Sequence, residues 1–471
     1  MRTIEPTPIV APSRGGGHSS ARWRRWAEDV MTGQGWVSVL VVLVMGTLLM
    51  AGGSFAFMLP HTDAAKYHCY AAAFWHGGAN YPADPSCDFL AGYASSLPFQ
   101  TLPKEYPILS LLPFSLTLLA PVQWDQVAFG LWMVAVAAGL YWYLGRVGPR
   151  GASLEFASYL VLGGWGTAAG RFDLIPAALT LFCLVAAVRG RFLWAYCWLA
   201  LATMLKLYPI LLLLPLFLAE QRADRGPLLR WCRLAGVGAF AAICAGLLLV
   251  SVLLTVQGAL SPLRYFTGRP IQIESLPASI MWLASFIGFP ICSDFQFSSL
   301  SIYDQVHGVC TALPGQAPGP LTDLLSPLFL VLTLAGVAWV TWMQWRGKLT
   351  IQQAFIGILL VIILTGKVFS PQYFIWLAPL VAYVMGFEST WLALWCLVSL
   401  LTTVVYPYLY GVKPIITEAP SVPAFYPTIA LRNLLLALVT LVYLFDIGQL
   451  RSRASEKATF ASATPRSRLR R

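Results

Sequence analysis

LPHTDAAKYHCY, residues 59–70, follows directly on the first long apolar run of the chain, residues 36–59. That run is long enough to cross a bilayer, which takes roughly 20 residues. A lone carboxylate, Asp63, therefore lies where the chain leaves the membrane, and Thr62 and Asp63 are both good helix N-caps. Three aromatic residues then recur at the spacing of a helix face that lies in the interface: Tyr67, Tyr70 and Phe74. We expect the rest of the chain to be a membrane scaffold that shapes a cavity around Asp63.

The composition is that of a polytopic membrane protein. Of the 471 residues, 58% are hydrophobic and only 11% are charged, whereas a soluble domain carries about 25% charged residues. The net charge of +11 collects in the tails and short loops. The positive-inside rule explains this pattern, so nucleic acid is not an expected partner. Residues 1–35 are polar and rich in Gly, Pro and Ser, and we expect a disordered, basic, cytoplasmic N-terminus without a cleavable signal peptide.

Thirteen apolar runs succeed one another, at about residues 36–59, 107–121, 126–145, 153–168, 174–188, 192–205, 207–219, 232–256, 321–345, 350–364, 372–387, 390–409 and 426–448. If all of them crossed the membrane, several arginine-rich turns and the basic C-terminal tail, residues 449–471, would lie outside. Run 107–121 is short and broken by proline, which suits a re-entrant segment, and every basic cluster then falls inside. The sequence thus predicts an all-α polytopic membrane protein, about 12 transmembrane helices plus one re-entrant segment over residues 36–448. Two outer loops with interfacial helices are expected at residues 60–106 and 257–320.

The cysteines give an independent indication of sidedness. Of nine in the chain, Cys69 and Cys87 lie in the first outer loop, and Cys292 and Cys310 lie in the second. The other five fall in spans or on the inner side. Pairs confined to outer loops are typical of disulfides in an oxidising compartment. Chance placement is the alternative, since Cys69 could simply face the interfacial helix and connectivity cannot be read from sequence.

Three cations stand at or near membrane depth on the predicted outer side: Arg171, Lys206 and Lys367. Such charges are costly unless they face a water-filled cavity or a partner. As a group they favour a site for an anion such as phosphate. Two alternatives stay open, because Arg171 could pair with nearby Asp173 and Lys206 could extend its charge to the interface.

Asp63 is the candidate general base, and its pKa is expected to rise at the mouth of an apolar cavity. The alternative is that Asp63 is an ordinary N-cap of the interfacial helix. Further candidates for substrate contact are Tyr67, Tyr106, Arg264, Arg269, Ser370 and Gln372. The alternative for Tyr106 is a tyrosine of the interface belt, and the alternative for Arg264 and Arg269 is a plain surface position. The three histidines of the first outer loop form no HExxH or similar pattern, so neither a metal nor another cofactor is expected.

This layout resembles the GT-C superfamily of integral membrane glycosyltransferases. Within it, three segments look like the D-x-x-x-Y and Y-P-P pattern of glycosyltransferase family 87: DAAKY at 63–67, NYP at 80–82 and YPI at 106–108. Two others, KLYP at 206–209 and Ser370-Pro371, resemble that family's Lys-x-x-Pro and Ser-Pro segments. GRFD at 170–173 stands where the family often has Gly-Gln-x-Asn. That departure could change the donor sugar or the acceptor.

The resemblance implies a GT-C-like fold and an inverting glycosyltransferase with Asp63 as its base. The implied partners are membrane lipids, a polyprenyl-phosphate sugar donor, with mannose as the expected sugar, and a glycolipid or glycan acceptor. The implied location is a bacterial plasma membrane, with cytoplasmic termini and a site that faces outside. Two alternatives remain open: a flippase or transporter of lipid-linked glycans without chemistry, and a non-catalytic subunit of an envelope-glycan complex.

Overall fold

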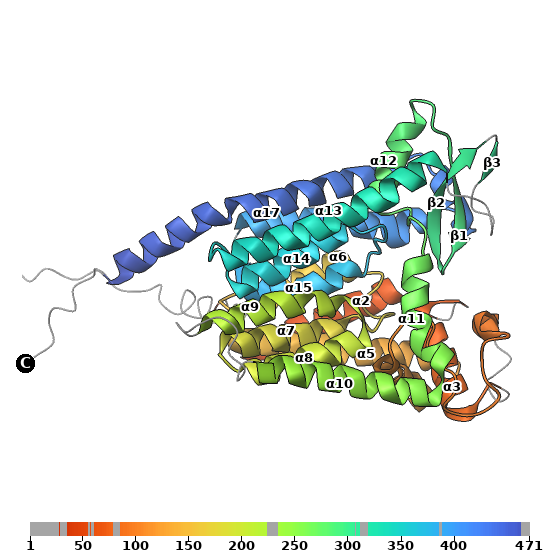
Figure 1. Cartoon of the computed structure of the whole chain (residues 1–471), viewed down its shortest axis with the longest axis horizontal. Helices are drawn as coiled ribbons and strands as arrows, with labels where there is room; N and C mark the ends of the chain where they lie inside the picture. The colour runs from red at the N-terminus through yellow and green to blue at the C-terminus, as the bar shows by residue number, and fades with distance from the viewer. Residues whose placement is uncertain are drawn as a thin grey trace, which may run out of the picture.

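The computed structural model describes residues 28, 35–54, 57, 61–78, 85–223, 234–306, 308–310, 319–385 and 389–462, with side chains as far as residue 445. In this part of the chain, twelve helices run lengthwise through one bundle (Figure 1): α2 (Gly35–Gly53), α5 (Asp125–Val147), α6 (Ala152–Gly164), α7 (Leu174–Val188), α8 (Phe192–Leu205), α9 (Leu213–Ala223), α10 (Leu234–Leu254), α13 (Pro320–Trp345), α14 (Ile351–Thr365), α15 (Tyr373–Met385), α16 (Ser389–Thr403) and α17 (Phe425–Ser462). Six helical stretches there are long and apolar enough to cross a membrane. The prediction of an all-α polytopic membrane protein is confirmed.

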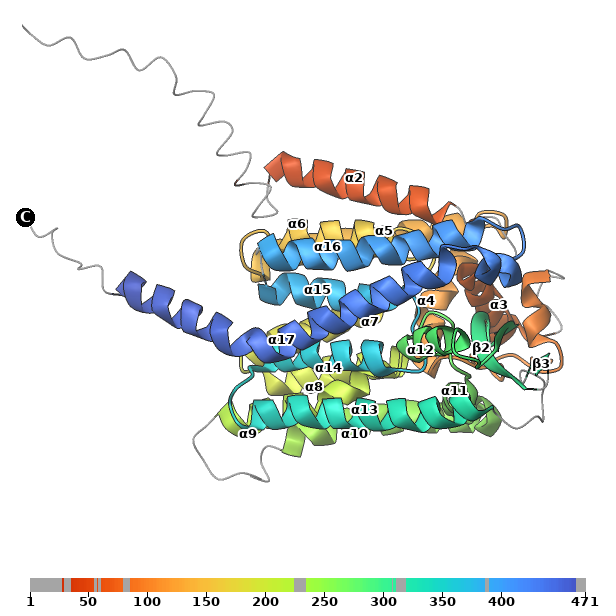
Figure 2. The ribbon, with the colours of Figure 1, turned by 90° about the horizontal axis from the view of Figure 1, so that it is seen from above.

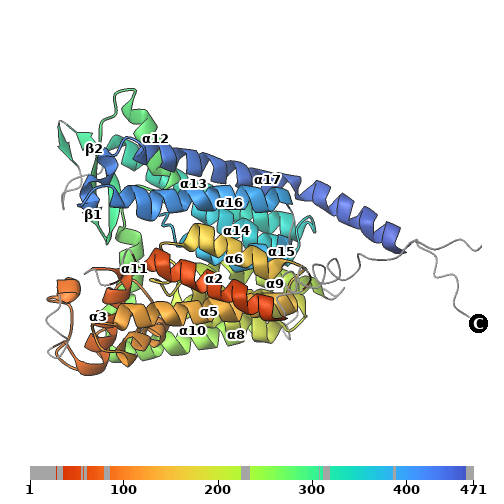
Figure 3. The same ribbon diagram turned by 180° about the vertical axis from the view of Figure 1, so that it is seen from behind.

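The two ends of the bundle differ in what they carry. The short helices α3 (Asp63–His76), α4 (Leu111–Ser115), α11 (Val256–Gly268) and α12 (Leu276–Ser285) gather with a small sheet at one end, which we call the loop end (Figure 2). The opposite end holds the C-termini of α5, α7 and α13 (Figure 2). Arg146, Arg189 and Arg346 stand at these C-termini, and we call this the arginine end. Along the outside of the bundle, α2 packs on α5 and α6 (Figure 3).

Run 107–121 enters and leaves the bundle at the loop end. It folds as three short turns, η2 (Ile108–Ser110), α4 and η3 (Leu116–Leu119). Just before it, Tyr106 packs edge-on against Tyr67 of α3 with 6.3 Å between ring centres. Just after it, Gln126 accepts a hydrogen bond of 2.7 Å from the Thr62 hydroxyl. Both ends of the run therefore adjoin α3, which is the predicted re-entrant arrangement.

Helix α3 is more enclosed than its amphipathic pattern indicates. Every residue from Ala64 to Phe74 is buried, because the helix is packed between α4, α5 and the turn η1 (Pro85–Leu90). A disulfide between Cys69 and Cys87 joins α3 to η1. The helix is thus a fixed wall at the loop end.

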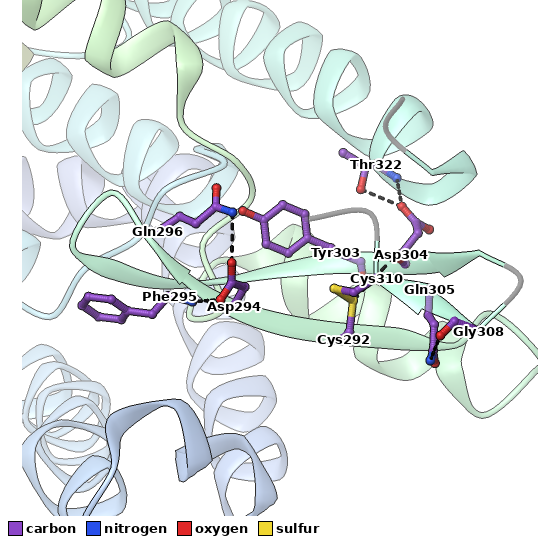
Figure 4. The surroundings of a disulfide bond; sticks show 10 residues. All are labelled: Cys292, Asp294, Phe295, Gln296, Tyr303, Asp304, Gln305, Gly308, Cys310 and Thr322. Atoms are coloured by element: carbon purple, nitrogen blue, oxygen red, sulfur yellow. Dashed lines mark hydrogen bonds between the residues drawn. A yellow bond between two sulfur atoms is a disulfide. The ribbon is translucent and has the colours of Figure 1, made fainter. Parts of the chain in front are cut away.

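The second outer loop contains a sheet that the sequence analysis did not predict. Strands β1 (Ile291–Gln296), β2 (Ser299–Val306) and β3 (Val309–Cys310) pair antiparallel in that order. A disulfide between Cys292 and Cys310 joins the outer strands (Figure 4). Asp304 of β2 accepts a 2.7 Å hydrogen bond from the Thr322 hydroxyl, which fastens the sheet to the start of α13 (Figure 4).

The chain ends bear on two predicted boundaries. The predicted disordered N-terminus lies outside the described residues, apart from Glu28 and Gly35. At the other end α17 continues to Ser462, past the boundary at 448 that the end of the apolar run predicts. A helix does not have to stop where its apolar face stops, because polar residues such as those after 448 can continue it in water.

Candidate functional site

A cavity of about 240 Å³ opens at the loop end, around Asp63. Segments far apart in the sequence line it: the first outer loop, the turn between α6 and α7, the second outer loop, the turn between α14 and α15, and the turn after α16. Polar side chains from these segments include Asp63, Lys66, Arg171, Gln272, Glu274, Ser299 and Ser370. A membrane bundle therefore has a polar cavity at one end.

Asp63 and Arg171 form an ion pair in this cavity. The Thr62 hydroxyl accepts a hydrogen bond of 3.2 Å from the Ala65 amide, and this N-cap places Asp63 as the first residue of α3. The Arg171 Nη2 lies 2.5 Å from the Asp63 Oδ2, and each side chain is 20% exposed. The predicted base and one predicted phosphate-binding cation thus lie together.

The pKa of Asp63 differs in direction from the sequence-based expectation. Burial alone would raise the pKa of this carboxyl, but the nearby positive charges of Arg171, Lys66 and Lys206 outweigh burial and hold it below its usual range. The expectation of a raised pKa is wrong, because the sequence does not reveal that Arg171 folds back onto Asp63. Asp63 is therefore ionised at neutral pH.

A second ion pair lies behind the wall of the cavity. The Lys206 Nζ is 2.6 Å from the Asp173 Oδ1, and the Asp173 side chain is only 1% exposed. The Trp376 indole also donates to Asp173, at 2.5 Å. The Lys206 ammonium lies 5.1 to 5.5 Å from the ring centres of Tyr106, Phe172 and Trp376. Lys206 is thus matched by a carboxylate, and it does not line the cavity.

In the turn between α6 and α7, the side chains of Arg171 and Asp173 point in opposite directions. Phe172 is fully buried and meets Tyr106 edge-on, with 5.0 Å between ring centres. Asp173, next to it, faces Lys206. These two anchors leave the preceding side chain, Arg171, directed into the cavity. The open alternative of an Arg171–Asp173 pair is not what the structure has.

The remaining basic candidates divide by position. The Lys367 Nζ donates to the carbonyl oxygen of Thr267 at 3.1 Å. Neither Lys367 nor the exposed Arg264 lines the cavity. The structure therefore does not bring them to Asp63. Arg269 adjoins the cavity, because its Nη2 donates at 2.9 Å to the hydroxyl of Ser299, a lining residue.

The polar and aromatic candidates also differ in whether they line the cavity. Ser370 lines the cavity, and its hydroxyl donates to the Oε1 of Gln372. Tyr67 is fully buried and stacks on Phe114 with 4.2 Å between ring centres, so it supports the wall with Tyr106. The NYP segment, residues 80–82, lies outside the described residues.

One ion pair of the cavity wall escaped the sequence analysis. The Arg432 Nη1 of α17 lies 2.9 Å from the Glu274 Oε2, with the side chains 0% and 2% exposed. The Tyr410 hydroxyl donates to the other carboxylate oxygen of Glu274 at 3.2 Å. The signal was available, because Arg432 stands inside the apolar run 426–448 and a charge there needs a partner.

No feature of the described residues is arranged as a metal site. No group of three or more His, Cys, Asp or Glu side chains among them could hold a metal ion. The Nδ1 of His68 lies 3.3 Å from the Asp125 carboxylate. That no cofactor takes part stays a prediction.

The cavity combines an ionised carboxylate with cations that can bind an anion. A carboxylate there can accept a proton from a hydroxyl group. An arginine beside it can bind a phosphate through two parallel hydrogen bonds. Neutral donors and acceptors such as Ser299, Gln272 and Tyr410 occupy the remaining wall.

Residues 166–280 match the family model of the GPI transamidase subunit PIG-U. The matched segment contains Arg171, Lys206 and Glu274, whereas Asp63 and Ser370 lie outside it. Neither the curated proteins nor the solved structures yield a match to this chain. The comparison supports a GT-C-like, multi-pass membrane protein and does not single out glycosyltransferase family 87.

Proposed function

We propose that this chain is an inverting glycosyltransferase. It moves a sugar, mannose as the first candidate, from a polyprenyl-phosphate donor to a hydroxyl of a glycolipid or glycan acceptor. The observation that carries the proposal is the Asp63–Arg171 pair, which places an ionised carboxylate and a phosphate-binding side chain 2.5 Å apart in one cavity. Lys66 adds a second positive charge to the same cavity.

The proposed reaction is one displacement at the anomeric carbon of the donor sugar. The acceptor hydroxyl gives its proton to the Asp63 carboxylate, and its oxygen attacks the anomeric carbon from the face opposite the phosphate. The bond between that carbon and the phosphate oxygen breaks, and the polyprenyl phosphate leaves with the electron pair. Arg171 and Lys66 stabilise the negative charge that collects on the leaving phosphate.

The ion pair also suggests an order of events. In the structure Arg171 occupies the carboxylate that has to act as base. A donor phosphate competes for Arg171, and its binding leaves Asp63 with less positive charge beside it. The pKa of Asp63 then rises, so the carboxylate becomes a stronger base once the donor is in place.

The proposed orientation puts the loop end outside the plasma membrane and the chain termini in the cytoplasm. Two features support it. Arg146, Arg189 and Arg346 stand at the C-termini of α5, α7 and α13, at the end opposite the cavity, as the positive-inside rule requires of a cytoplasmic face. The disulfides Cys69–Cys87 and Cys292–Cys310 both lie at the loop end, as an oxidising exterior allows.

The match to a GPI transamidase subunit favours one second candidate. In this alternative the chain is a subunit of a membrane complex that binds a lipid-linked glycan without itself making or breaking a glycosidic bond. A transporter has less support, because transporters place their polar sites near the midplane. Here the pairs of Asp63, Asp173 and Glu274 lie towards the loop end.

The test is sugar transfer by the full chain in nanodiscs, with polyprenyl-phosphate-[¹⁴C]mannose as donor and a native lipid extract as acceptor. Wild type is compared with Asp63→Asn and with Asp88→Asn, an exposed carboxylate of the same loop that does not line the cavity. We expect labelled product from wild type and Asp88→Asn only. Transfer by Asp63→Asn at the wild-type rate would remove Asp63 from its role. Failure of wild type with mannose and with other polyprenyl-phosphate sugars would favour the subunit.

A further inference from the structure

A groove on the outside of the bundle lies apart from the cavity. It runs between α5 and α7, and its lining is mostly apolar, with one charged residue. Side chains from both helices form its walls, among them Val136, Trp142, Ile175, Leu179 and Phe182. Arg146 is the only charged residue among those that line it.

Gly139 keeps the groove open along α5. It is exposed and lines the groove, and an added Cβ would meet no heavy atom within 4 Å. A larger side chain at this position would therefore project into the groove without striking a neighbouring helix. Because no side chain projects from α5 at Gly139, the groove has room there for a flexible apolar chain.

Arg146, the charged residue of the groove, lies far from the cavity. Gln126 of α5 lines the cavity, and Arg146 follows it by twenty residues of the same helix. A helix rises 1.5 Å per residue, so the two levels are separated by about 30 Å. Arg146 lies in the last turn of α5, and Arg189 is the C-cap residue of α7, the other helix that lines the groove. The arginine end of the groove is thus flanked by two positive charges.

We propose that the groove binds one anionic glycerophospholipid. An acyl chain lies along α5 and α7, and Arg146 binds the phosphate, with Arg189 beside it. Charge complementarity identifies the class, because the guanidinium groups favour a net negative headgroup over a zwitterionic one. The sugar donor is a poorer fit, because a phosphate held by Arg146 would be about 30 Å from the level of Asp63. The proposal is independent of glycosyl transfer.

The test titrates the delipidated full chain in detergent with three probes: phosphatidylglycerol, phosphatidylcholine and polyprenyl phosphate. Native mass spectrometry counts the bound lipids. We expect phosphatidylglycerol to bind most tightly. Arg146→Gln should weaken that binding about fivefold, which corresponds to about 1 kcal/mol for one cation at an anionic headgroup. Arg346→Gln, at the same end but outside the groove, should bind like wild type.

A pair of glycine variants tests the groove itself. Gly139→Leu fills the groove and should remove this bound phosphatidylglycerol. Gly246→Leu adds the same side chain to exposed α10, where an added Cβ also meets nothing within 4 Å, and should bind like wild type. Thermal unfolding checks that both variants fold. Equal binding by Gly139→Leu and Gly246→Leu, equal affinity for the two phospholipids, or displacement of phosphatidylglycerol by polyprenyl phosphate would each overturn the proposal.

Discussion

Replacing Arg171 with glutamine removes the guanidinium that lies 2.5 Å from the Asp63 carboxylate. The polar lining of the cavity remains, because glutamine still offers an amide. Burial of Asp63 also remains, and burial raises its pKa. The substitution therefore removes the largest effect that lowers the pKa of this carboxyl and keeps the one that raises it.

The expected direction follows from the short distance. An opposite charge this close stabilises the ionised form of a carboxyl and lowers its pKa. Asp63 acts as a base only when it is ionised, so the rate falls as the pH drops through its pKa. The acidic limb of the profile should therefore move to higher pH in Arg171→Gln. Loss of the hydrogen bond to the donor phosphate should also lower the rate at the optimum, on the order of 10- to 100-fold.

The measurement is kcat/KM for the labelled donor from about pH 4 to pH 9, because this ratio reports the pKa values of the free enzyme. Lys413→Gln is the matched control, since it removes an exposed cation that does not line the cavity. Its acidic limb should coincide with that of wild type. If the limb of Arg171→Gln also coincides with wild type, Arg171 does not control the ionisation of Asp63 and the reasoning is refuted.

Three further predictions concern the frame of the site. Arg432→Met leaves Glu274 charged and buried without its partner, so the free energy of unfolding should fall by about 3–5 kcal/mol. Thermal unfolding in detergent checks this. Adding Glu274→Gln to Arg432→Met should recover much of the lost stability. Serine at both Cys69 and Cys87 removes a crosslink between positions 18 residues apart and should cost about 3 kcal/mol; an unchanged midpoint would show that the crosslink does not stabilise the fold. Lys206→Met leaves the buried Asp173 carboxylate without its cation and should lower the unfolding midpoint more than Lys206→Arg; equal midpoints would argue against that ion pair.

The bundle was predictable because its signals are local. The length and hydropathy of an apolar run predict a helix, whatever that run packs against. All thirteen apolar runs contain helical structure. The prolines of run 107–121 and the placement of basic residues were enough to separate a re-entrant segment from a crossing one. The alternation of polar and apolar residues over 299–302 carried a strand signal too. That strand was not predicted, because a short alternating stretch in a long polar loop is a weak pattern.

The pairing of charges was not predictable, because it depends on which loops meet. Arg171 and Asp173 are neighbours in the sequence, yet each pairs with a residue from another segment, Asp63 and Lys206. The buried side chain of Phe172 between them fixes that outcome. The direction of the Asp63 pKa depends on the same contact, so sequence reasoning named both residues of the pair but gave the wrong direction for the pKa.

The family match and the site overlap only in part, and this bears on the choice between enzyme and subunit. Residues 166–280 supply Arg171, Arg269 and Glu274, so the matched segment can provide cations and wall for a lipid-linked glycan. The candidate base comes from α3, outside that segment. Binding of a lipid-linked glycan without a reaction needs only the residues of the matched segment, whereas sugar transfer needs Asp63 as well. An Asp63→Asn variant that retains the donor but forms no product would assign chemistry to this chain, and equal donor binding with no product from wild type would assign it the role of a subunit.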